Sequence, residues 1–232
     1  MTGVEASEVL EELEALADER NIKGMRRYGI RSRCRILGVP KPKLRELAKR
    51  IGVDHKLALE LWDTKVHEAR ILASMIADPM ELSEETMEKW ALDFDNWDLC
   101  DQCVLNLFWK SRHAYRKAAE WPKRREEYVR RAGLALIAKL AAKDRNLKDS
   151  FFESLLPLIR EASKDSRRHV YKAASWALRQ IGKRSPKLNK IALEIAEEMS
   201  KSPISHERKV GCETLRELKS RKLEAKLSKA KA

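Results

Sequence analysis

The stretch Val129-Arg130-Arg131-Ala132-Gly133-Leu134-Ala135-Leu136 recurs in altered form as Val170-Tyr171-Lys172-Ala173-Ala174-Ser175-Trp176-Ala177-Leu178. Both copies begin with Val, reach a basic residue two positions later and continue with small and then apolar residues. Fainter copies occur at Val66 to Met75 and at Arg208 to Leu215. The basic positions of the four copies are spaced by 61, 41 and 37 residues: Arg70, Arg131, Lys172 and Lys209.

If a helix at Trp97 supplies a further copy, it divides the first interval and every spacing falls between about 30 and 41 residues. This period, with two helices per unit, is typical of HEAT-type repeats, whose helix pairs must stack to bury their apolar faces. We therefore expect an all-α fold, a curved solenoid of stacked antiparallel helix pairs with a concave basic groove. Residues 1–218 are expected to form a single domain, and 219–232 a Lys-rich tail that frays.

Composition supports amphipathic helices and a polyanionic partner. Charged residues make up 37% of the chain and aromatic residues 6%, with only 8 Gly and 7 Pro. The net charge of +13 favours nucleic acid as the partner. No apolar run approaches the roughly 18 residues of a membrane span, and four cysteines are too sparse for a disulfide framework. We expect a monomer that is cytoplasmic and nucleoid-associated and has no membrane contact.

The sign of the charge reverses abruptly near the N-terminus. Residues 4–19 are expected to form an acidic helix, whereas the basic stretch that follows surrounds Met25, Tyr28 and Ile30. A charge run is usually a solvated face, and contact with phosphates is the alternative. The cations of this stretch are Arg20, Lys23, Arg26, Arg27, Arg31, Arg33 and Arg35.

The spacing predicts an indole and a carboxylate on one face of a helix that begins near Asp95 or Asn96 and ends near Lys110. Trp97 and Asp101 are four residues apart and therefore lie one turn apart. A core Trp beside a solvated Asp is the alternative. On a second inner helix, Lys172, Trp176 and Arg179 fall at i, i+4 and i+7, so that two cations flank another indole. Such a groove suits nucleic acid, because aromatic rings pack on sugars or bases while cations hold phosphates.

These residues resemble those of the DNA alkylation repair enzymes built from HEAT-like repeats, the AlkD-like DNA glycosylases. The resemblance rests on Trp97-Asp98-Leu99-Cys100-Asp101, Arg130-Arg131-Ala132 and the run from Lys172 to Arg179, and it extends over about residues 20–215. It implies a monofunctional N-glycosylase that removes cationic alkylated purines, such as 3-methyladenine and 7-methylguanine, from double-stranded DNA. It implies that Trp97 and Trp176 pack on the deoxyribose and that Asp101 is the catalytic carboxylate. Arg131 or its neighbour Arg130 is implied as the DNA-binding arginine.

The implied chemistry requires neither metal nor cofactor. A base that carries a methyl group on a ring nitrogen is already positive and leaves readily. Two indole faces and a carboxylate stabilise the oxocarbenium-like sugar that remains, and Asp101 can also orient or deprotonate the attacking water. Because no lysine belongs to the group of Trp97, Asp101 and Trp176, we do not expect Schiff-base strand cleavage.

The sequence also allows two other interpretations. Cys100 and Cys103 have the spacing of half a zinc site or a redox pair, but the sequence has no second pair at ligand spacing. Alternatively, the solenoid is a non-catalytic scaffold that binds damaged or structured DNA, or a protein partner. The presence of Asp101 favours a catalytic function over a scaffold, because a carboxylate does not contribute to the binding of phosphates.

Overall fold

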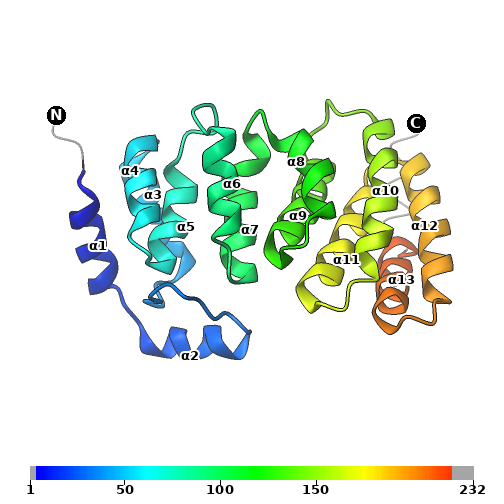
Figure 1. The fold of residues 1–232 in the computed structure, drawn as a ribbon, viewed down its shortest axis with the longest axis horizontal. Helices are drawn as coiled ribbons and strands as arrows, with labels where there is room; N and C mark the ends of the chain where they lie inside the picture. The colour runs from blue at the N-terminus through cyan, green and yellow to red at the C-terminus, as the bar shows by residue number, and fades with distance from the viewer. Residues whose placement is uncertain (1–3, 221–232) are drawn as a thin grey trace. The chain divides into compact units, whose positions relative to one another are not determined.

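The computed structural model describes residues 4–220, which form thirteen α-helices and two short 3₁₀ helices (Figure 1). These residues contain no β-strand, and Arg35 and Val66 form an isolated bridge. The predicted all-α class is therefore confirmed. No helix within this range is both long and apolar enough to cross a membrane. The chain divides into two compact units, Met1–His113 and Ala114–Ala232, which are described separately below. The single domain expected over residues 1–218 stays a prediction, and 221–232 of the expected tail lie outside the described residues.

The first unit stacks helices around an aromatic core. α5 packs against α3, α4 and α7. The rings of Trp62 and Trp90 stack with their centroids 4.0 Å apart, and both side chains are buried. Figure 1 shows α2 at a steep angle to α3 and α5. The helices are α1 (Ala6–Ala15), α2 (Glu19–Arg27), α3 (Lys41–Ile51), α4 (His55–Asp63), α5 (His67–Ile76), α6 (Glu84–Leu92), α7 (Trp97–Asn106) and η1 (Phe108–Lys110).

The second unit is built from helix pairs whose second members touch one another. α10 packs on α11 and α12 on α13, while α11 also contacts both α9 and α13. Two glycines permit close approach: a Cβ at Gly133 would clash with Pro122, and one at Gly211 with the backbone of Ser200. The repeats proposed from the sequence thus correspond to stacked helices within this unit. Its helices are α8 (Ala114–Glu120), η2 (Trp121–Lys123), α9 (Glu127–Lys143), α10 (Asp149–Ser163), α11 (Arg168–Gly182), α12 (Pro186–Ser200) and α13 (Ser205–Leu218).

Side-chain caps explain where several helices begin. The side chains of Asp54, Ser83 and Ser185 accept backbone N–H groups of α4, α6 and α12. The single helix predicted over residues 4–19 is wrong. Asp18 is instead the N-cap of α2 and accepts the backbone N–H of Arg20 at 2.7 Å, so α1 has already ended at Ala15.

One other boundary differs from the expectation. The helix that begins at Trp97 stops at Asn106 instead of continuing to Lys110, because Leu107 leaves the helical region and a 3₁₀ turn follows. α10 contains Pro157 and continues across it to Ser163.

Candidate nucleic-acid interface

The first unit places Trp97 and Asp101 together on α7. Asn96 is the N-cap and accepts the backbone N–H of Leu99 at 3.0 Å, which fixes Trp97 as the first helical residue. Trp97 and Asp101 are both partly exposed, whereas Leu99 and Cys100, which lie between them in sequence, are buried. The indole and the carboxylate therefore lie at the edge of the core, one helical turn apart.

The Trp97 indole is held in place by a hydrogen bond. Its Nε1 donates to the backbone carbonyl of Tyr28, which follows α2, at 3.1 Å. This bond leaves the flat faces of the ring for packing contacts. Tyr28 itself is 77% exposed.

A buried ionic network lies beside this pair and was missed in the sequence. Asp98 is 4% exposed; its Oδ2 lies 2.6 Å from Nζ of Lys41 and 3.3 Å from Nε2 of His67. Burial alone would raise the pKa of Asp98, but the hydrogen bond from His67 and the charge of Lys41 outweigh it and hold the pKa below its usual value. The network fixes the start of α7, and no sequence spacing connects its three members.

In the second unit, the two candidate arginines of α9 are engaged with the neighbouring repeat. Nη1 of Arg130 lies 3.0 Å from Oδ2 of Asp165. Arg131 is 8% exposed, and its Nη1 donates to the carbonyl of His169 at 2.7 Å. Each guanidinium therefore joins α9 to the start of α11, and Arg131 presents little surface to a ligand.

The stripe of Lys172, Trp176 and Arg179 predicted for this unit lies on α11. Trp176 and Arg179 are partly exposed and Lys172 is exposed. Both cations meet acidic residues of α13: Lys172 pairs with Glu213, and Nε of Arg179 lies 2.7 Å from Oε2 of Glu217. The sequence did not predict that α13 would neutralise this stripe.

α2 carries a row of exposed cations. Arg20, Lys23 and Arg27 are exposed and form no ion pair with any described residue. They fall at i, i+3 and i+7 and therefore share one face. Within residues 4–220 the cations of this face are not paired with carboxylates, whereas Lys172 and Arg179 on α11 are.

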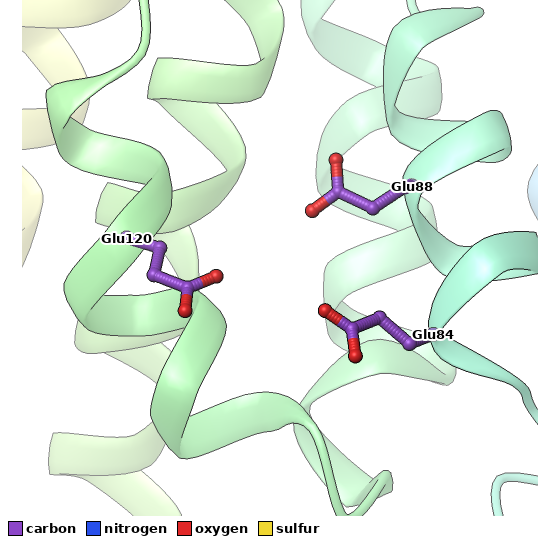
Figure 2. A group of neighbouring side chains, drawn as sticks. All are labelled: Glu84, Glu88 and Glu120. Atoms are coloured by element: carbon purple, nitrogen blue, oxygen red, sulfur yellow. The ribbon is translucent and has the colours of Figure 1, made fainter.

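The cysteine pair forms no metal cluster. Cys100 and Cys103 are both buried, and burial strongly raises the pKa of the Cys103 thiol. No group of metal-ligand residues within 4–220 includes either of them. Figure 2 shows carboxylates elsewhere: Glu84 and Glu88 on successive turns of α6, and Glu120 at the end of α8. The two helices belong to different units, and Glu120 is paired within its own helix with Lys117, at 3.1 Å.

Comparison with known proteins places the chain in a family. The sequence profile described as "DNA alkylation repair enzyme" matches residues 9–207. The chain belongs to the DNA alkylation repair enzyme family. This membership confirms the resemblance drawn from the sequence and supports a role in DNA repair. The comparison with curated proteins gives no match.

Solved structures show that this family member has the HEAT-like repeat fold. One is described as "a new family of proteins related to the HEAT-like repeat DNA glycosylases with affinity for branched DNA structures". It is 24% identical, with a TM-score of 0.77, and the match covers 92% of this chain and 95% of that chain. Two designed armadillo repeat proteins are less similar, with 15% and 14% identity and TM-scores of 0.37 and 0.35. Those matches cover 75% and 82% of this chain, and 91% and 80% of the designed ones.

Proposed function

We propose that this protein is a monofunctional DNA glycosylase that removes cationic alkylated purines, such as 3-methyladenine and 7-methylguanine, from double-stranded DNA. The observation that carries the proposal is the placement of Trp97 and Asp101 one turn apart and partly exposed on α7. Membership of the DNA alkylation repair enzyme family supports DNA with alkylated bases as the substrate.

The chemistry follows from the charge of the lesion. A purine alkylated on a ring nitrogen leaves as a neutral base, so the enzyme has to stabilise the positive sugar rather than protonate the leaving group. In the proposal Asp101 stabilises this cation and orients the attacking water, while Trp97 packs its indole against the deoxyribose. Trp176 is proposed as the second indole, from its partly exposed position on α11.

Phosphate contacts are proposed for cations of α9 and α11. Lys172 and Arg179 flank Trp176 on α11, and to bind phosphates they have to exchange their carboxylate partners on α13. Arg130 and Arg131 are the further candidates on α9. If about six phosphates are bound, the logarithm of the affinity falls with the logarithm of the salt concentration with a slope near −5.

The decisive experiment measures the release of free base from methylated duplex DNA. We expect wild-type protein to release 3-methyladenine or 7-methylguanine. Asp101→Asn should abolish release and leave DNA affinity nearly unchanged. Asp63→Asn, which removes the same charge from an exposed position on α4, is the matched control and should retain activity.

Two outcomes would contradict the proposal. Wild-type protein that binds duplex or branched DNA but frees no base would show a non-catalytic DNA-binding scaffold. Affinity that does not respond to salt would show that DNA phosphates are not the ligand and would favour a protein partner.

A further inference from the structure

A cavity of about 360 Å³ lies within the first unit, beside Trp97. Its walls come from α2, from the segment that leads into α3, and from α5. Apolar side chains dominate the lining, among them Met25, Ile30, Val39 and Ile71. A cavity of this size and character is in the usual range of sites for small planar ligands.

One wall is a single face of α2 and of the residue that ends it. Asn21, Gly24, Met25 and Tyr28 all line the cavity and fall at i, i+3, i+4 and i+7. α2 contains no buried residue, so this face is not part of a filled core.

Gly24 has no role in the fold that would require a glycine. It lies inside α2, its φ is not positive, and a Cβ at this position would meet no atom within 4 Å. Glycine in the middle of a helix is less stable than alanine, so its presence calls for a reason. Neither the backbone conformation nor internal packing supplies this reason. We infer that a ligand approaches this wall of the cavity closely and leaves no room for a larger side chain at Gly24.

The cavity carries groups suited to a nucleobase. Tyr28, which is exposed, and Trp97, which is partly exposed, offer aromatic surface on which a base can stack. The side chain of Asn21 donates from Nδ2 to the carbonyl of Gly38 at 3.0 Å, which leaves its Oδ1 to accept a hydrogen bond. Nδ1 of His67, another lining residue, is buried and has no hydrogen-bond partner among the described residues.

The adjacent face of α2 supplies the matching charge. Arg20, Lys23 and Arg27 are exposed, without ion pairs among residues 4–220, and follow the helix beside the cavity-lining face. A cavity for a planar ring next to a row of free cations is complementary to a base and the phosphates of its own strand. We propose that the cavity accepts one unpaired nucleobase of a bound DNA strand whose phosphates contact these cations. This inference rests on the DNA-binding part of the proposed function and not on catalysis.

The test compares three duplexes by fluorescence anisotropy at one salt concentration: fully paired, with one bulged adenine, and with one bulged abasic nucleotide. The abasic bulge bends the duplex without offering a base. We expect wild-type protein to bind the adenine bulge about tenfold more tightly than the abasic bulge. Gly24→Phe, which fills the cavity, should remove this difference and leave affinity for paired DNA unchanged.

A second variant covers the case in which Gly24→Phe disturbs α2. Tyr28→Ala removes an exposed ring and should reduce the preference for adenine over the abasic bulge severalfold, while affinity for the abasic bulge stays constant. Arg27→Ala should weaken all three complexes equally.

Three outcomes distinguish the base-binding cavity from the proposed glycosylase activity. Equal wild-type affinity for the adenine and abasic bulges would overturn the base-binding cavity. A preference for adenine in a protein that releases no methylated base would support the cavity and contradict the glycosylase. No affinity for any of the three duplexes would overturn both.

Discussion

Oε1 of Glu213 on α13 lies 2.5 Å from Nζ of Lys172 on α11, so α13 neutralises a cation proposed to bind DNA. Burial favours the neutral carboxyl, but hydrogen bonds from Lys172 and Ser175 outweigh it and lower the pKa of Glu213. The carboxylate is thus charged at neutral pH and competes with phosphate for Lys172 and for Arg179, whose Nη1 is 3.6 Å away.

Glu213→Gln should therefore raise DNA affinity. We expect an increase of roughly two- to fivefold, the range of a partly exposed ion pair, in an anisotropy titration at low salt. Glu194→Gln makes the same charge change on an exposed residue of α12 that forms no ion pair within residues 4–220, and it is the control. If both variants show the same affinity, Glu213 does not compete with the phosphates.

Asp98→Asn should destabilise the first unit. The substitution removes a buried charge that accepts from Lys41 and His67, and we expect a loss of about 2 kcal/mol in the free energy of unfolding at pH 7. Urea denaturation measures it. A variant as stable as wild type would show that the network contributes nothing to the fold.

The same network predicts a pH dependence. Because the pKa of Asp98 is lower in the folded than in the unfolded state, its contribution is complete above the unfolded value of about 3.9 and is lost as the pH falls through the folded value. The stability difference between wild type and Asp98→Asn should therefore shrink below about pH 4. A constant difference between pH 3 and 6 would argue against this ionic origin.

The arginines of α9 and the lysine of α11 should respond differently to substitution. Arg131→Ala removes a buried hydrogen bond to the carbonyl of His169 and should lower the free energy of unfolding by about 1.5–3 kcal/mol. Lys172→Ala should change stability little and should reduce the salt slope of DNA binding by about one. A reduced slope for Arg131→Ala at unchanged stability would instead identify Arg131 as the phosphate ligand.

Two glycine substitutions should have opposite effects on stability. Gly211→Ala places a methyl group against the backbone of Ser200 and should cost about 1–3 kcal/mol, because α12 and α13 must separate. Gly24→Ala meets no atom and should raise stability by about 0.5–1 kcal/mol through helix propensity. Thermal unfolding distinguishes them, and a destabilised Gly24→Ala would show that the fold itself requires this glycine.

Local patterns in the sequence determined most of the helices. Asp54, Ser83 and Ser185 cap helices through local contacts, because capping depends on a side chain and an N–H group only two or three residues away. The one-turn spacing of Trp97 and Asp101 on α7 is likewise set by local geometry. The split at Asp18 was missed because an acidic residue fits both a helix interior and an N-cap.

Tertiary structure decided which partner each side chain meets. Asp98 is 57 residues from Lys41, and Lys172 is 41 residues from Glu213. A repeat pattern indicates that a helix has an inner face, but it does not specify which side chain of the neighbouring helix lies opposite. The cavity beside Trp97 has the same origin: Gly24 and Tyr28 line it together with His67 of α5 and Trp97 of α7, which are distant in sequence. The sequence alone therefore determined the helices and their faces, and long-range packing determined which charges are neutralised and which remain open to DNA.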